Sequence, residues 1–283
     1  HLVVSVDTNM NCPNYFTLSD DEKKAHDDKV KENSDYIIFD EYPFVFNGAG
    51  VVNGNRTSLY MVDKNDWSVK KIVPDTFNVG SFEMINGKLI ICANDFETVM
   101  TKWDKIYQYD PKKNKVKEIY SEKMQIHRVF EENGKIYVKG TFGRDYGEME
   151  AGKFYELKNY ELELVLDSDY SFYNAVGSDC RYGKYKNYLK VDGHVYFISA
   201  CESRSVVFEF TPEELKTIVS YEGSVDDLQV VDGKMYVIGL KEQALQEVYV
   251  KEDDIVNKLI KNMILLLESL EKDYKEYIKI IRR

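Results

Sequence analysis

One phrase recurs four times along the chain, first as Met84-Ile85-Asn86-Gly87-Lys88-Leu89-Ile90. The later copies centre on Asn133-Gly134, Asp192-Gly193 and Asp232-Gly233, at distances of 47, 59 and 40 residues from one copy to the next. Asn-Gly and Asp-Gly readily adopt the two positive φ angles of a type I′ turn, which joins adjacent antiparallel strands. Because apolar residues flank each pair, the phrase predicts four tight β-hairpins.

A second phrase follows each hairpin and alternates apolar with polar residues, as a half-buried strand does. Examples are the residues from Lys105 to Asp110 and from Val206 to Phe210. In several copies a polar turn and one more apolar strand come next, as in the residues from Lys115 to Tyr120. Each repeat of about 40 to 60 residues therefore predicts four antiparallel strands, which is the usual content of a β-propeller blade.

We assign residues 1–250 to an all-β propeller of about five blades that is incomplete at its ends. The 22 Tyr and 14 Phe agree with a high strand content. Residues Leu2 to Val6 are expected to form an inner strand of the first blade. A charged helical insertion is predicted at about residues 17–34, with Ser19 as its N-cap and Glu22 completing a capping box.

The last part of the chain, residues 251–283, predicts an amphipathic helix. Its apolar residues fall on one helical face from Ile255 to Ile281. Such a helix either packs on the propeller or associates with a second copy of itself to give a homo-oligomer. Binding to a membrane surface is less favoured, because basic and acidic residues are mixed along the segment.

The charge and cysteine content exclude several classes of protein. The net charge of −11 in 283 residues repels phosphate groups and argues against nucleic-acid binding. No apolar run is long enough to span a membrane, and the four cysteines do not have metal-ligand spacing. We therefore expect a cytoplasmic protein with reduced thiols and no metal or other cofactor. Because the chain begins at His1 rather than Met, we also expect its natural N-terminal part to have been removed.

The sequence lacks the residues that hydrolases of the Ser-His-Asp type need. A nucleophile on a strand-to-helix turn is typically found in Gly-x-Ser-x-Gly, and this motif does not occur. No two histidines have the spacing of a metal site. We therefore assign no catalytic residue and expect this chain alone to be inactive.

The loop Gly143–Glu148 is a candidate ligand-facing loop. It interrupts a predicted hairpin with one Arg, two acids and a Tyr. A pair of carboxylates at the mouth of a propeller could also act on a glycan, so an enzyme that acts on carbohydrate stays open as an alternative.

The stretch from Asp35 to Asp63 is the least generic part of the sequence. It reads Asp35-Tyr36-Ile37-Ile38-Phe39-Asp40-Glu41-Tyr42-Pro43-Phe44-Val45-Phe46-Asn47-Gly48-Ala49-Gly50, and a basic residue and a strand ending in Val62-Asp63 follow. This stretch resembles the acylaminoacyl-peptidase branch of the prolyl oligopeptidase family of serine peptidases. The charged helical insertion and the blade spacing over residues 1–250 are also similar to that family.

The resemblance implies a non-catalytic propeller that gates the access of short peptides to an α/β-hydrolase domain. That catalytic domain, which would release N-terminal amino acids, acylated or not, or dipeptides from short peptides, is absent from this sequence. We expect contacts with a peptide terminus in two loops. The residues are Phe44, Phe46, Asn47, Arg144, Asp145, Tyr146 and Glu148. The alternative is a stand-alone propeller that binds a protein or peptide and self-associates through its C-terminal helix.

Overall fold

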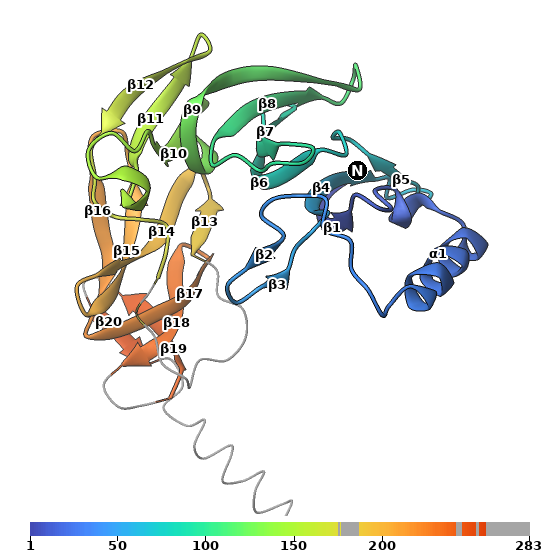
Figure 1. Cartoon of the computed structure of the whole chain (residues 1–283). Helices are drawn as coiled ribbons and strands as arrows, with labels where there is room; N and C mark the ends of the chain where they lie inside the picture. The colour runs from blue at the N-terminus through green and yellow to red at the C-terminus, as the bar shows by residue number, and fades with distance from the viewer. Residues whose placement is uncertain (175, 177–186, 242–244, 253–254, 259–283) are drawn as a thin grey trace, which may run out of the picture. The chain divides into compact units, whose positions relative to one another are not determined.

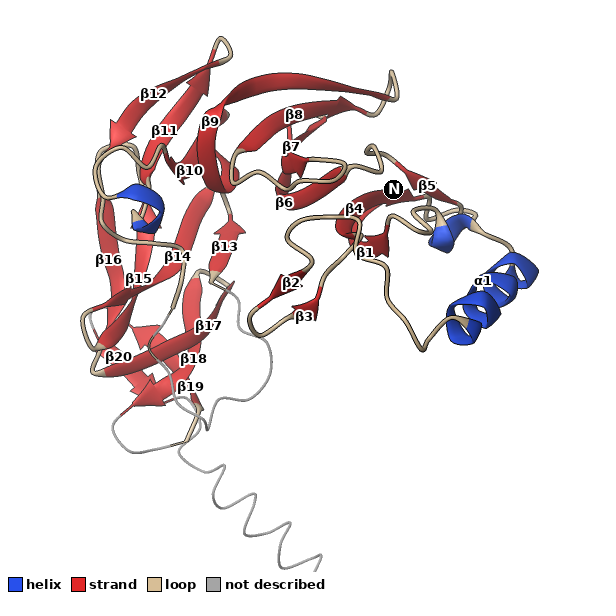
Figure 2. Ribbon diagram, viewed as in Figure 1, coloured by secondary structure: helices blue, strands red, loops and turns tan. Residues whose placement is uncertain are grey.

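The computed structural model describes residues 1–174, 176, 187–241, 245–252 and 255–258. The chain divides into two compact units, His1–Asp169 and Tyr170–Arg283. Strands are the main secondary structure of the described residues in both units (Figure 2). The predicted all-β class is therefore confirmed.

The first sheet of unit 1 has three antiparallel strands in the order β1-β4-β5. Their bounds are β1 (Leu2–Asn9), β4 (Asn55–Val62) and β5 (Val69–Lys71). The expected early strand at Leu2–Val6 is thus confirmed within β1. The connection from β1 to β4 contains a short hairpin of β2 (Val45–Phe46) and β3 (Gly50–Val51).

A seven-stranded antiparallel sheet forms the rest of unit 1 (Figure 1). Its strands are β6 (Phe77–Ile85), β7 (Lys88–Asp95), β8 (Asp104–Asp110), β9 (Lys115–Glu132), β10 (Lys135–Thr141), β11 (Lys153–Lys158) and β12 (Glu161–Leu166). Strand β9 has 18 residues and pairs with β8 along its first part and with β10 along its second. Two four-stranded repeats therefore share one continuous strand.

Unit 2 contains two four-stranded antiparallel sheets. The first comprises β13 (Tyr188–Val191), β14 (His194–Cys201), β15 (Arg204–Phe210) and β16 (Leu215–Ser220). The second comprises β17 (Gly223–Val231), β18 (Lys234–Lys241), β19 (Glu247–Glu252) and β20 (Ile255–Lys258). The larger sheets of the described residues thus comprise one three-stranded unit and four four-stranded repeats, two of which share β9.

The predicted boundary between propeller and C-terminal helix is wrong. Residues 251–252 continue β19, and residues 255–258 form β20, which pairs with β19. An apolar pair such as Ile255-Val256 suits a strand as well as a helix, and pairing with a preceding edge strand favours the strand. The remainder of the predicted helix, residues 259–283, lies outside the described residues.

The four hairpin turns are confirmed by their backbone angles. The residues before glycine have φ values of 50° at Asn86, 51° at Asn133, 51° at Asp192 and 50° at Asp232. The glycine that follows each of them also has positive φ. Both central residues are therefore left-handed, as a type I′ turn requires.

The charged insertion contains helix α1 (Asp20–Glu32), which follows the short 3₁₀ helix η1 (Tyr15–Thr17). Ser19 and Glu22 form the predicted capping box, with the Ser19 backbone N–H donating to Glu22 Oε2 at 2.8 Å. No residue of α1 is buried. The helix is therefore a solvated arm, joined to the preceding segment by a hydrogen bond of 2.9 Å from Tyr15 Oη to Asp27 Oδ2.

Apolar side chains fill the space between successive sheets. One cluster joins Leu59 of the first sheet to Phe77, Leu89 and Ile91 of the second. A second cluster lies between the two repeats that share β9, and a third lies within unit 2. Within each unit, neighbouring sheets thus bury apolar faces against each other, as blades do.

Candidate functional site

Three long connections lie at one edge of unit 1, opposite the Asn-Gly turns. Residues 10–54 join β1 to β4, residues 96–103 join β7 to β8, and residues 142–152 join β10 to β11. Asp104 at the start of β8 pairs with Met124, and Thr141 at the end of β10 pairs with the next residue, Gln125. The end of the second connection therefore lies beside the start of the third. The two predicted loops belong to the first and third connections, which occupy equivalent parts of the first and third repeats.

The first and second connections are joined by backbone hydrogen bonds. The Tyr42 N–H donates to the Thr98 carbonyl at 2.8 Å, and the Met100 N–H donates to the Tyr42 carbonyl at 2.9 Å. These bonds accompany a parallel β-bridge between Tyr42 and Val99. The segment that carries the family resemblance is therefore fixed to the second repeat.

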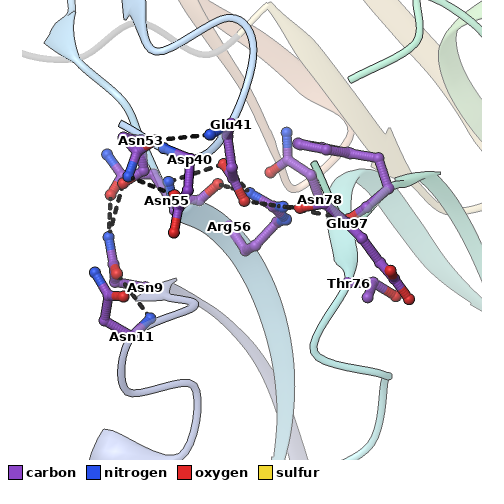
Figure 3. A network of polar contacts seen from close by, with 12 residues as sticks. Asn9, Asn11, Asp40, Glu41, Asn53, Asn55, Arg56, Thr76, Asn78 and Glu97 are labelled. Atoms are coloured by element: carbon purple, nitrogen blue, oxygen red, sulfur yellow. Dashed lines mark hydrogen bonds and ion pairs between the residues drawn. The ribbon is translucent and has the colours of Figure 1, made fainter. Parts of the chain in front are cut away.

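A buried ion pair between Glu41 and Arg56 stands at this junction (Figure 3). Arg56 Nη2 donates to Glu41 Oε1 at 2.6 Å, and Nη1 donates to Oε2 at 3.1 Å. The two side chains are only 1% and 6% exposed. The Arg56 guanidinium also lies 3.7 Å from the centre of the Phe96 ring and donates to the Phe96 carbonyl at 3.2 Å. The Arg56 side chain thus joins the start of β4 to both the first and the second connection.

Asparagine side chains extend the network around the ion pair. Asn53 Oδ1 accepts hydrogen bonds from the N–H groups of Asp40 and Glu41 at 3.2 and 3.1 Å. Asn9 Nδ2 donates at 3.0 Å to the Asn53 carbonyl and at 3.0 Å to Asn55 Oδ1. These bonds fix the path of the first connection where it returns to the sheet (Figure 3).

A cavity of about 740 Å³ opens beside the network. The polar part of its lining includes Asp7, Asn55, Thr57 and Asn78 as well as Arg56 and Glu41. The apolar part includes Phe16, Phe46, Phe96 and Met100. Pockets that bind small ligands in proteins usually have this size and this combination of apolar walls with a few polar groups.

Of the three predicted residues in the first loop, one lines this cavity and the other two lie outside its lining. Phe46 lines it and is 43% exposed. Phe44 instead stacks on Phe39, with ring centres 4.5 Å apart. Asn47 lies in the turn of the β2–β3 hairpin, where the Ala49 N–H donates to the Phe46 carbonyl at 3.2 Å. Of the seven predicted site residues, the described lining of the cavity includes Phe46 alone.

The second predicted loop is organised by its own contacts. Glu150 Oε1 accepts hydrogen bonds from the N–H groups of Asp145 and Tyr146 at 2.7 and 2.6 Å. The Arg144 guanidinium lies 4.5 Å from the centre of the Phe142 ring. Tyr146 is 86% exposed, and the side chain of Glu148 lies outside the described residues. The structure places this loop at the same edge as the first loop but not in the lining of the cavity.

A buried lysine anchors the end of the second loop. Lys139 Nζ donates to the Gly152 carbonyl at 2.6 Å and lies 4.2 Å from the centre of the Phe154 ring. Burial lowers the pKa of the Lys139 amine to about 7, and the charges of Asp167 and Asp169 oppose part of this shift. The buried amine therefore loses its proton near neutral pH, whereas an exposed lysine stays protonated there.

The substitution Lys139→Met is expected to flatten the dependence of stability on alkaline pH. In the unfolded chain the lysine pKa is 10.5, so between about pH 7 and pH 10.5 the unfolded state binds an extra proton. The free energy of unfolding of the unchanged protein should rise with pH in this window, by at most about 1.4 kcal/mol per pH unit. Urea unfolding at several pH values measures the slope. Lys135→Met, at an exposed position of the same strand, should leave the slope unchanged; equal slopes in all three proteins would contradict the expectation.

Sequence reasoning missed Glu41, Arg56, Asn53 and Asp7 as site residues. The first three lie within the Asp35–Asp63 stretch, so the unusual composition of that stretch was the available signal. Arg56 is a charged residue at the start of the strand β4. Because arginine is rarely buried without a partner, this position could have indicated an ion pair.

The described residues contain no cluster of three or more potential metal ligands. Cys12, Cys92 and Cys201 are free thiols, and Cys180 lies outside the described part of the chain. Among the helices that the structure describes, none has the length and apolar character needed to cross a membrane.

Comparisons with known proteins identify the fold. No known family profile matches the chain, and no curated protein sequence matches it. Among solved structures, it is similar to Pyrococcus horikoshii acylaminoacyl peptidase, with a TM-score of 0.63 and 14% identity over 94% of this chain. It is also similar to the β-propeller domain of the Trilobed protease from Pyrococcus furiosus, which has an open velcro topology. That match has a TM-score of 0.52 and 18% identity, and covers 75% of this chain and 64% of the propeller domain.

The chain spans 37% of the length of the acylaminoacyl peptidase. Its fold is therefore similar to part of that peptidase and to the β-propeller domain of the Trilobed protease.

Proposed function

We propose that this chain is the non-catalytic propeller of a serine peptidase and that it gates the access of short peptides. The observation that carries the proposal is the fold match over 94% of the chain, which covers only 37% of the acylaminoacyl peptidase. In the proposed whole enzyme, an α/β-hydrolase domain releases N-terminal amino acids, acylated or not, or dipeptides from the short peptides that the propeller admits.

The loop edge of unit 1 supports a role in peptide binding. Its cavity offers side-chain amides, which match the hydrogen-bonding groups of a peptide backbone, next to aromatic walls that suit an apolar side chain. The Glu41–Arg56 pair and the Tyr42–Val99 bridge hold the first connection against the second repeat. A loop fixed in this way can exclude a bulky chain while it admits a short one.

Binding of fluorescein-labelled peptides of three to six residues tests the proposal. We expect saturable binding by fluorescence anisotropy, weakened roughly tenfold by Phe46→Ser because an aromatic wall is lost. Phe44→Ser is the matched control, since Phe44 is exposed to a similar extent (39% against 43%) but contacts Phe39 outside the cavity lining.

Two results would contradict the proposal. Failure of every short peptide to bind would remove the peptide-binding role. Labelling of the chain by a fluorophosphonate probe at a serine would show that the chain is itself catalytic, whereas we expect no labelling and no hydrolysis of acylaminoacyl esters.

A further inference from the structure

We infer that the cavity beside the Glu41–Arg56 pair binds a positively charged amino group of a peptide, with an apolar side chain next to it. The inference rests on the proposed function, that this chain binds short peptides, and it adds the chemical class of peptide and the residue that recognises it. That residue is Asp7, at the end of β1.

The charges that line the cavity do not balance. Its lining holds two carboxylates, Asp7 and Glu41, one guanidinium, Arg56, and the imidazole of His26, which has its own carboxylate partner, Asp27, at 3.1 Å. Both Glu41 oxygens are engaged by Arg56, and Oε2 also accepts the Gly54 N–H at 2.8 Å. The charge of Arg56 is therefore neutralised by its ion pair with Glu41. The negative charge of Asp7 remains to attract a cation.

Asp7 is exposed and only partly engaged. Its Oδ1 accepts a hydrogen bond of 3.1 Å from Thr57 Oγ1, and no cationic partner contacts it in the part of the chain that the structure describes. An ammonium group that approaches Asp7 would gain a charge-assisted hydrogen bond without breaking an existing ion pair. A carboxylate-containing ligand would instead be repelled.

Amide donors lie near this carboxylate. Asn78 Oδ1 accepts the Thr57 N–H at 2.9 Å, and Asn55 Oδ1 accepts from Asn9 at 3.0 Å. Each of these bonds uses the oxygen of the side-chain amide and leaves the Nδ2 donor available to a ligand. Two donors beside one carboxylate suit a peptide end, where carbonyl oxygens lie within two or three bonds of the amino group.

The apolar walls of the cavity determine which kind of side chain can lie next to the bound amino group. Phe46, Phe96 and Met100 contribute apolar surface from two different connections. Burying an apolar side chain against them contributes free energy that a polar side chain would not. A volume of about 740 Å³ is sufficient for one or two residues of a peptide.

The amino group can come from two sources, the free amino terminus of a peptide or a lysine side chain. Three peptides of equal length, each fluorescein-labelled at its C-terminal end, distinguish them. The first begins with a free phenylalanine, the second is the same peptide with an acetylated amino terminus, and the third is acetylated and carries a lysine beside the phenylalanine.

For the unchanged protein we expect the first peptide to bind roughly tenfold more tightly than the second, because one ammonium–carboxylate contact is lost on acetylation. This preference should shrink as salt is added, since Asp7 is exposed to solvent. Binding of the third peptide at the strength of the first would show that the site accepts an ammonium group from either source. Binding at the strength of the second would assign it to the free terminus.

The variant Asp7→Asn should remove the preference and leave the binding of the acetylated peptide unchanged. Asp28→Asn is the matched control, because Asp28 is an exposed acid of α1 outside the cavity lining and its change alters the net charge equally. Equal affinity for the first two peptides, or a preference that persists in Asp7→Asn, would overturn the inference and leave the proposed peptide binding intact. Failure of all three peptides to bind would overturn both.

Discussion

Replacing Glu41 with alanine is expected to lower the free energy of unfolding by about 3–5 kcal/mol. The substitution leaves the guanidinium of Arg56 without its carboxylate, at a position where the side chain is 1% exposed. The backbone N–H of Gly54 would lose its acceptor as well. Urea-induced unfolding followed by tyrosine fluorescence measures the change.

An exposed ion pair in the same unit provides the control. Lys105 and Glu118 are 3.0 Å apart, with side chains 39% and 43% exposed, so Glu118→Gln should cost less than about 1 kcal/mol. The double variant Glu41→Leu with Arg56→Met removes both charges and should regain most of the stability that Glu41→Ala loses. A loss in Glu41→Ala no larger than that in Glu118→Gln would show that burial does not determine the contribution of this pair.

The substitution Gly140→Val should destabilise the protein by about 3 kcal/mol or more. A Cβ atom at residue 140 would lie 2.4 Å from the Gln125 carbonyl oxygen and 2.7 Å from the Met124 methyl carbon. The register of β10 against β9 shifts between Lys139 and Gly140, which brings the two backbones close together at this bulge. The strands must separate to accept a side chain.

The expected cause can be separated from the general cost of replacing a glycine. Gly87 has a φ of +73°, but no atom lies within 4 Å of the position that a Cβ would take there, so Gly87→Ala should cost only about 1 kcal/mol through backbone strain. Thermal unfolding of both variants gives the comparison. Similar losses in the two would mean that the close approach at Gly140 relaxes without penalty.

The local signals in the sequence were sufficient for most of the strands. Asn-Gly and Asp-Gly at four positions specify the turns because few other dipeptides adopt their backbone angles at low cost. The sequence did not indicate that β9 runs unbroken from one repeat into the next. Residues 121–125 contain no Gly, Pro or Asn that would end a strand, and the repeat period alone suggested a break there.

The site was harder to predict than the fold because its contacts are distant in sequence. Glu41 and Arg56 are separated by a 14-residue segment that holds a hairpin, and Asp7 reaches the same cavity from another strand. Pattern and propensity describe local geometry and say nothing of which of 49 acidic residues will meet a given arginine. The resemblance pointed to the stretch that holds Glu41 and Arg56, and among the residues predicted within that stretch Phe46 lines the cavity.

The continuous strand β9 also bears on how this repeat architecture can change. Deleting or duplicating a single repeat at this point would cut a strand whose two parts hydrogen-bond to different partners, β8 and β10. The two repeats joined by β9 are therefore expected to be inherited, lost and unfolded together, as one indivisible module among blades that elsewhere in the described chain are separate sheets.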